Sequence, residues 1–185
     1  MLLNFNEEII PDTNTLYREA MATINAGLQN DKYYFNQLFT EKNGYYETNF
    51  QLFDQMGIYN TLNPKTKKPA KEIQGLYIFY EGGAAKYAGI SRKILNRLRN
   101  HFIGKDHFQA SLVYLMARAE EDKKGLFMKR RKDLEFHPYR EQIQPLMREK
   151  WQIQIIPETD SFKRALLEIL VACELKTQWN SFETH

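Results

Sequence analysis

Cysteine is nearly absent from the sequence: the 185 residues include one, Cys173. A single cysteine excludes an internal disulfide framework, and no CxxC or Cys/His grouping has the spacing of a zinc site. Cys173 follows Leu170, Val171 and Ala172, a context that predicts a buried small hydrophobe rather than a nucleophile. We therefore expect neither a disulfide nor a structural zinc to hold the fold.

Long apolar runs are also missing. The first eight residues lack the basic and apolar regions of a signal peptide, and no stretch approaches the length of a membrane span. Internal repeats and low-complexity tracts are absent. Because 43% of the residues are hydrophobic, the chain can bury one sizeable core. These features predict a globular, cytoplasmic protein.

The net charge of +3 is small but unevenly placed. Residues 1–70 carry six basic and eight acidic side chains, whereas residues 71–185 carry twenty and fifteen. Two acid-free basic clusters lie in the second part, one from Arg92 to Lys105 and one from Lys123 to Lys132. Such clusters attract phosphate backbones, although a solvated surface face is an equally good interpretation of the second one.

Apolar periodicity in the first sixty residues is typical of helices. Leu16, Ala20, Ile24 and Leu28 recur at helical spacing, and the apolar residues between positions 33 and 56 suggest one or two further helices. The stretch 63–69 contains two prolines and breaks any regular element. We therefore predict an N-terminal helical extension at 1–70 and a second domain at 71–185.

The second domain begins with two β-prone runs. Strands are predicted at 75–80 and 86–90, joined by a glycine-containing hairpin. Ser91 is positioned to cap the helix that follows. The apolar residues of that helix face inward, leaving Lys93, Arg97 and His101 as a polar, cationic stripe on another face. The inward residues are Ile94, Leu95, Leu98 and Phe102.

Four further elements are expected toward the C-terminus. Residues 107–120 and 133–148 are predicted as helices, the second interrupted by prolines. Residues 151–156 alternate like a strand that ends at Pro157, and 162–176 is a closing helix after a capping region at 159–161.

The order of these elements and the side chains they carry resemble the GIY-YIG nuclease superfamily over roughly residues 73–182. The two name-giving motifs stand as Gly75-Leu76-Tyr77 and Tyr87-Ala88-Gly89, with Leu and Ala in place of isoleucine at the packing positions. The family's helical arginine falls on Arg97, and a histidine found one turn later in several members falls on His101. Its metal-binding glutamate falls on Glu168 and its late asparagine on Asn180.

A literal Gly57-Ile58-Tyr59 also occurs, but it is rejected as the first motif. The residues after it, 60–64, are unsuited to continue a strand, and no Tyr-x-Gly follows at the required distance.

The resemblance implies an α+β fold, with a small three-stranded antiparallel sheet flanked by helices and the extension added at 1–70. It also implies a nuclease domain at 71–185, which here carries a basic helical insertion at about 104–134. The implied activity is a divalent-metal-dependent DNA endonuclease that leaves 5′-phosphate and 3′-hydroxyl ends. Mg²⁺ is the expected metal, with Mn²⁺ able to substitute. The implied catalytic residues are Tyr77, Tyr87, Arg97, His101, Glu168 and Asn180, with Glu168 as the metal ligand.

The chemistry of the charged residues agrees with such a site. Glu168 is the only charge in the apolar window 165–173, and a half-buried carboxylate there needs a cation to offset its desolvation. That cation is a divalent metal or, alternatively, Arg164 one turn earlier. Arg97 suits a phosphate, because a guanidinium stays charged and can hold two oxygens.

The remaining candidates have more than one possible role. Tyr77 and Tyr87 have phenols whose pKa is ordinarily about 10, so either becomes a base only near a metal or a guanidinium. Tyr77 is the preferred base of the two. His101 can bind phosphate or act as the base. Asn180 either positions the closing segment or touches the phosphate, and a turn asparagine is the plainer alternative.

Double-stranded DNA is the expected partner. Lys93, Arg99, Lys105, Arg130 and Arg131 are predicted to contact it. The N-terminal extension at 1–70 and the insertion at 104–134 are expected to contact the DNA duplex or to form a dimer surface, which would give a restriction-like homodimer. The alternative is that these two parts only cover the sheet. A repair or mobile-element nickase is the alternative enzyme, and a DNA-binding module that no longer cuts is the alternative outside enzymes.

Overall fold

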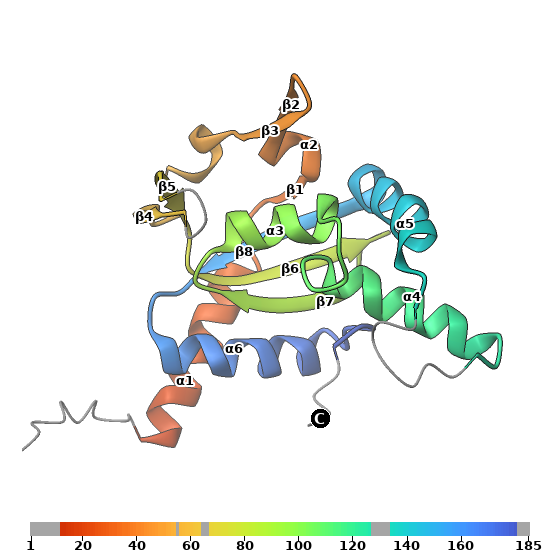
Figure 1. Ribbon diagram of the computed structural model, residues 1–185. Helices are drawn as coiled ribbons and strands as arrows, with labels where there is room; N and C mark the ends of the chain where they lie inside the picture. Colours follow the sequence, from red (N-terminus) through yellow and green to blue (C-terminus); the bar gives the residue numbers. More distant parts are fainter. Residues whose placement is uncertain (1–11, 55, 64–66, 127–133, 181–185) are drawn as a thin grey trace, which may run out of the picture.

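The computed structural model describes residues 12–54, 56–63, 67–126 and 134–180. Over these residues the fold is α+β, with six α-helices and antiparallel sheets (Figure 1). In chain order the elements are α1 (Thr13–Gly27), β1 (Lys32–Tyr34), α2 (Phe35–Leu38), β2 (Phe39–Lys42), β3 (Tyr45–Thr48), the 3₁₀ helix η1 (Phe50–Phe53), β4 (Tyr59–Leu62), β5 (Pro69–Glu72), β6 (Gly75–Glu81), β7 (Ala84–Ser91), α3 (Ile94–Ile103), α4 (Ser111–Lys123), α5 (Phe136–Lys150), β8 (Trp151–Pro157) and α6 (Ser161–Glu174).

The central sheet has four strands in the order β1-β8-β6-β7, all antiparallel. The predicted hairpin is present, with β6 and β7 joined through Gly82 and Gly83, both at positive φ. The expectation of three strands was wrong by one, because β1 pairs with β8 and places Lys32 opposite Gln154. This short strand comes from residues 32–34, where aromatic side chains had been assigned to a helix. The hydrogen bonds that these residues form with the edge of β8 outweigh their local helical pattern.

Helices cover both faces of this sheet, because successive side chains of a strand point to opposite sides. Tyr77 and Phe79 of β6 face α3 and belong to the larger part of the core, with α4 and α5 nearby. Leu76 and Ile78 face the other way and pack with buried residues of α1 and α6. Figure 1 shows α3 above the sheet and α6 below it.

Helix α3 buries the apolar residues that its periodicity predicted, namely Ile94, Leu95, Leu98 and Phe102. Its cap differs from the prediction. The helix begins at Ile94, and Ser91 Oγ accepts a hydrogen bond from the Lys93 N–H (2.9 Å) outside the helix. The free N–H groups of Leu95 (2.9 Å) and Asn96 (3.2 Å) are instead bound by the carboxylate of Glu72, which ends β5. A residue distant in sequence thus starts this helix.

The prediction of a helical extension at 1–70 is confirmed for α1 but wrong for most of the remainder. Helix α1 is capped by Asp12, whose carboxylate accepts the N–H groups of Asn14 (3.0 Å) and Thr15 (3.1 Å). The later residues form α2, η1 and two small antiparallel sheets, β2-β3 and β4-β5. The signal that was missed is Asn43-Gly44, where both residues have positive φ (52° and 79°), as in a tight hairpin turn.

The predicted boundary near residue 70 falls inside the β4-β5 hairpin, since Leu62 pairs with Pro69. Residues 60–62 do continue as a strand, contrary to the sequence argument against Gly57-Ile58-Tyr59. This strand pairs only with β5 in a separate two-stranded sheet, so the rejection of that motif is unaffected. Because β1 also joins the central sheet, the first seventy residues and the rest share one framework.

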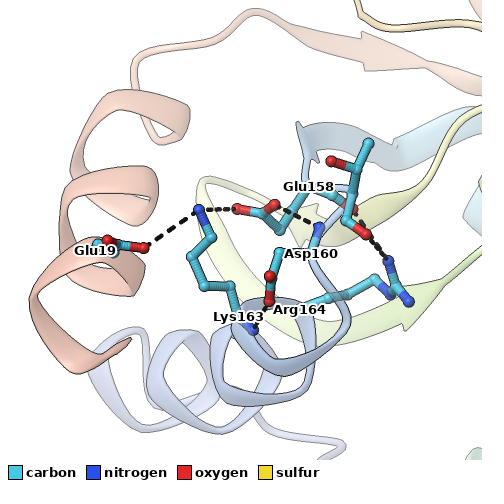
Figure 2. Close-up of polar contacts among 6 residues, drawn as sticks. Glu19, Glu158, Asp160, Lys163 and Arg164 are labelled. Carbon is cyan, nitrogen blue, oxygen red and sulfur yellow. Dashed lines mark hydrogen bonds and ion pairs between the residues drawn. The ribbon is translucent and has the colours of Figure 1, made fainter. Parts of the chain in front are cut away.

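A polar network fastens α1 to the start of α6 (Figure 2). Lys163 Nζ lies 3.6 Å from the carboxylate of Glu19 on α1 and 3.4 Å from that of Glu158. Asp160 caps α6 by accepting the Lys163 N–H (2.8 Å). Beside this network Gly27 packs so tightly that a Cβ there would lie 2.5 Å from Ile156 Cγ2. Helix α1 is therefore docked by both charge and close packing.

Two further sequence expectations have a definite outcome. Cys173 is exposed, not buried, because it lies on the side of α6 that faces away from the sheet residues packed against Ala172 and Val171. Within the described residues, none of the helices is long and apolar enough to cross a membrane.

Arg130 and Arg131, which were predicted to contact DNA, lie outside the described residues.

Candidate functional site

The two glycine–tyrosine motifs meet on adjacent strands. Tyr77 of β6 pairs in register with Gly89 of β7. A Cβ at position 89 would lie 2.5 Å from Tyr77 Oη and 2.9 Å from the ring of Tyr87. The absence of a side chain at Gly89 therefore lets the Tyr77 phenol extend across β7 toward the edge of the sheet. The rings of Tyr77 and Tyr87 are 6.1 Å apart.

The first motif's glycine is required for a different reason. Gly75 has φ of +149°, a conformation that residues with a side chain rarely adopt. A Cβ there would also lie 2.2 Å from the carbonyl oxygen of Ile156. Gly75 thus allows β6 to enter the sheet closely packed against β8, which sets the position of Tyr77 two residues later.

His101 of α3 packs against the ring of Tyr77 and is completely buried. Its Nε2 is 2.9 Å from Tyr77 Oη, and its Nδ1 has no hydrogen-bond partner among the described residues. Burial, together with the charge of Arg97, lowers the pKa of His101 well below its ordinary value. The predicted cationic stripe on α3 is therefore wrong at this position: His101 is neutral, and its burial prevents direct contact with a phosphate. It supports Tyr77 from within the core.

The two tyrosines differ in how easily they could lose a proton. Complete burial raises the pKa of Tyr77 well above its ordinary value, although the charge of Arg97 opposes that rise. Tyr87 is partly exposed; burial raises its pKa as well, but the charge of Arg97 opposes that rise. Glu168 acts in the other direction on Tyr87. The environment therefore favours Tyr87 over Tyr77 as the reactive phenol, the reverse of the preference drawn from the sequence.

Arg97 is half-buried and anchored by residues that the sequence argument did not identify. Its Nη1 donates to the backbone carbonyl of Gln109 (3.2 Å), and its Nη2 donates to Ser111 Oγ (2.5 Å). A guanidinium has more N–H donors than these two acceptors use, so some remain for another oxygen ligand. Neither anchor had a sequence signal, because both lie beyond a loop whose path local patterns do not reveal.

Glu168 of α6 is also half-buried, and its surroundings link it to Arg97. Burial raises the pKa of the Glu168 carboxyl, while the charge of Arg97 lowers it. Helices α3 and α6 cover opposite faces of the sheet and both contact the edge strand β7; the charge of Arg97 influences Glu168 there, without an ion pair between the two among the described residues. The alternative partner Arg164 is wrong. It donates to Gln74 and to the carbonyls of Glu158 and Thr159, and it forms no ion pair with Glu168 in the described part of the chain.

Asn180 holds the outer edge of the second motif. Its Oδ1 accepts the N–H of Ala88 and its Nδ2 donates to the carbonyl of Ala88, both at 2.8 Å. Thr177 Oγ1 donates to the same Oδ1 (2.8 Å), and the Trp179 N–H donates to the carbonyl of Lys86 (2.9 Å). The C-terminal segment thus pairs along β7, and this pairing engages the Asn180 Oδ1 twice and one of the two Nδ2 N–H donors. Of its two predicted roles, the geometry favours positioning.

The basic residues predicted to contact DNA fall into different environments. Lys105 is exposed, whereas Lys93 donates to the carbonyl of Leu62 (3.2 Å). Arg99 is turned inward: it hydrogen-bonds Thr48, lies 5.0 Å over the ring of Phe39, and has its pKa lowered by burial. Arg99 therefore helps to hold β2 and β3 against α3. Its guanidinium is not available at the surface to bind DNA.

The residues at this site could bind a divalent cation only with few protein ligands. Across residues 12–180, the described segments contain no group of three or more His, Cys, Asp or Glu side chains able to hold a metal. Glu168 supplies one carboxylate, with the phenol of Tyr87 close by. Magnesium commonly takes one or two carboxylates and completes its shell with waters and substrate phosphate oxygens. The hard oxygen donors at this edge fit Mg²⁺ or Mn²⁺ in that manner.

Comparison of the chain with protein-family models, with curated proteins and with solved structures gives no significant match.

Proposed function

We propose that the chain is a divalent-metal-dependent DNA endonuclease whose active site lies at the β7 edge of the sheet. The observation that carries the proposal is that Tyr87 lies on β7, while Arg97 and Glu168 lie on the two helices, α3 and α6, that contact this strand. A half-buried acid, a half-buried guanidinium and a partly exposed phenol form a set suited to phosphodiester hydrolysis. The GIY-YIG resemblance assigns the same residues to that reaction.

Arg97 is the group that binds the phosphate. Its fixed charge attracts the non-bridging oxygens and stabilises the additional negative charge that they carry in the transition state. Gln109 and Ser111 hold the guanidinium in place, so less conformational entropy is lost when DNA binds. The two anchors thus support Arg97 without contacting the substrate.

Tyr87 is the group that orients the attacking water and accepts its proton. Burial raises the pKa of Tyr87 above its ordinary value, and the charge of Arg97 opposes that rise; a cation held by Glu168 would stabilise the phenolate form further. Tyr77 and His101 position Tyr87 for this step. The neutral, buried imidazole of His101 hydrogen-bonds the Tyr77 hydroxyl, and the Tyr77 ring packs beside the Tyr87 ring. Asn180 fixes the backbone next to Tyr87.

Glu168 is the residue that would hold the metal. When bound there, the cation supplies positive charge to the scissile phosphate and to the departing oxygen. Attack of water on phosphorus forms a new P–O bond and breaks the bond to the 3′ oxygen, which takes up a proton. The products are then a 5′-phosphate and a 3′-hydroxyl, as the resemblance implies.

Plasmid cleavage tests the proposal. Supercoiled DNA is incubated with the wild-type protein and with Glu168→Gln, in Mg²⁺, in Mn²⁺ and in chelator. We expect cleavage with either metal, none in chelator, and at least a hundredfold loss of rate in the variant, because one electrostatic contact to a transition state is worth about that much. Glu174→Gln is the matched control, since Glu174 is exposed at the end of the same helix.

The products also separate the alternatives. Open circles that persist indicate a nickase, whereas linear products indicate cutting of both strands, as a restriction-like homodimer would give. Equal cleavage by the wild type and Glu168→Gln would overturn the assignment of this site. Binding of DNA without cleavage in any metal would instead favour the non-cleaving module.

A further inference from the structure

The segment that joins α3 to α4 (Figure 1) carries a large apolar side chain, Phe108. Phe108 is 70% exposed, one of the highest values for a large hydrophobic residue in the described chain. Its ring lies against that of His107, with 4.3 Å between the centroids. Leaving so much aromatic surface in water forgoes a stabilisation of about 1.5 to 3 kcal/mol that burial would give. A binding role would account for this exposure.

The loop around Phe108 is held rigidly by its own hydrogen bonds. Asp106 Oδ1 accepts the N–H groups of Phe108 and Gln109, both at 2.9 Å. Gln109 Oε1 accepts the N–H of Lys105 (3.0 Å), and the Ala110 N–H donates to the carbonyl of Asp106 (3.0 Å). The exposed ring is therefore carried by an ordered turn, so a ligand that binds it meets a preformed surface.

The same loop is part of the candidate active site. Gln109, the residue directly after Phe108, supplies the carbonyl that holds Arg97 Nη1. The aromatic ring thus starts one residue away from the anchor of the phosphate-binding guanidinium. The exposed Lys105 adds positive charge to the loop, while the Asp106 carboxylate is engaged by two N–H groups.

An exposed aromatic ring on the loop that anchors a cationic phosphate-binding residue is a combination suited to binding unpaired nucleotides. Bases stack on the ring, and the backbone follows the positive charge. In an intact duplex each base is stacked on its neighbours, so neither face is accessible without unstacking. The ring would therefore discriminate against fully paired DNA near the cleaved bond.

We propose that Phe108 stacks on a nucleobase next to the phosphate held by Arg97, and that the substrate is DNA with an unpaired or unstacked base at this point. This inference rests on the proposed nuclease function and narrows its substrate class. It replaces the regular duplex expected from the sequence with single-stranded or locally unpaired DNA.

Binding measurements in chelator test the inference separately from cleavage. Fluorescently labelled DNA is titrated as a single strand, as the matching duplex, and as that duplex with one mismatch. The proteins are the wild type, Phe108→Ala, Phe108→Trp and the control Tyr45→Ala, which removes a 77% exposed aromatic from another part of the fold. Circular dichroism confirms that each protein is folded.

We expect the wild type to bind the single strand and the mismatched duplex more tightly than the paired duplex. Phe108→Ala should weaken binding of those two ligands about tenfold, the usual effect of losing one base–aromatic stack. Phe108→Trp should retain the affinity, with its indole emission quenched on binding. Tyr45→Ala should leave every affinity unchanged.

Three outcomes would overturn the inference: equal affinity of the wild type for all three ligands, unchanged binding by Phe108→Ala, or no DNA binding at all. The proposed function can fail independently. If stacking at Phe108 is found but plasmid is not cut in any metal, the inference is supported while the nuclease activity is not. If plasmid is cut and Phe108→Ala binds normally, the reverse holds.

Discussion

At the scale of single residues, the candidate site depends on side chains that are kept small or neutral. Gly89 leaves the space that the Tyr77 phenol occupies, and His101 can be buried against that phenol because its imidazole stays uncharged there. A protonated imidazole at this depth would be an unpaired buried charge, which folded proteins rarely tolerate. The motif residues thus shape the position of the reactive groups as much as they supply them.

Substitution of Gly89 by alanine should therefore disturb both folding and activity. The added Cβ would lie 2.5 Å from Tyr77 Oη and 2.6 Å from the carbon that bears it, so the phenol must move. We expect a loss of about 1–3 kcal/mol in the free energy of unfolding, typical of overpacking, and at least a tenfold fall in cleavage rate. Chemical denaturation and the plasmid assay measure the two effects.

A double substitution shows whether the clash with Tyr77 is the cause. In a Tyr77→Leu background the ring is gone, so adding Gly89→Ala should cost clearly less stability than it does in the wild type. An equal cost in both backgrounds would mean that the alanine acts through another contact, such as the ring of Tyr87.

At the scale of elements, α3 is started from outside its own sequence. Its first free N–H groups are bound by Glu72 of β5, a residue that is only 5% exposed. Burial raises the pKa of this carboxyl, and the hydrogen bonds from Leu95 and Asn96 oppose that rise. Because Arg97 is in the first turn of the helix, this cap also helps to fix the direction of the guanidinium.

Removal of the cap should destabilise the protein measurably. We expect Glu72→Ala to lower the free energy of unfolding by about 1–2 kcal/mol, the usual cost of a lost cap. Glu72→Gln should lose less, since it keeps one acceptor and buries no charge. The exposed Glu149 on α5 offers Glu149→Ala as a control that should change little. Denaturant titrations would contradict this account if both Glu72 variants matched that control.

At the scale of the whole molecule, the N-terminal region completes the framework around the site. Strand β1 extends the central sheet and α1 covers the face that carries α6, where Glu168 lies. Deleting residues 1–60 would thus remove a sheet strand together with half of a helical layer. Such a deletion would damage the fold itself, so it cannot report on a dimer surface.

A single buried residue tests this integration more gently. Ile24 of α1 is fully buried against the second face of the sheet. We expect Ile24→Ala to cost about 2–4 kcal/mol while the protein still unfolds in one cooperative transition. Ile169→Ala on the exposed side of α6 is the matched control and should cost far less. Two separate transitions, with only the first affected, would indicate an independent N-terminal unit.

Local sequence patterns determined much of the second half of the chain. The strands β6, β7 and β8, the inward face of α3, and α6 with its cap at Asp160 all follow from residues within a few positions of one another. Glycine in the motifs and alternation in the strands are local properties, so a single sequence displays them. The two motifs also carry the resemblance to GIY-YIG nucleases, and that resemblance marked Tyr77, Tyr87, Arg97 and Glu168 as candidates.

The tertiary structure alone decided which of these groups are buried, charged or already occupied. It placed His101 in the core, turned Arg99 inward, used the amide of Asn180 to hold Ala88, and recruited Gln109 and Ser111 to anchor Arg97. It also made β1 from residues that had been assigned to a helix. The physical reason is common to all of them: burial, and the pKa shift that follows from it, depends on partners far away in the sequence, and local periodicity carries no information about those partners.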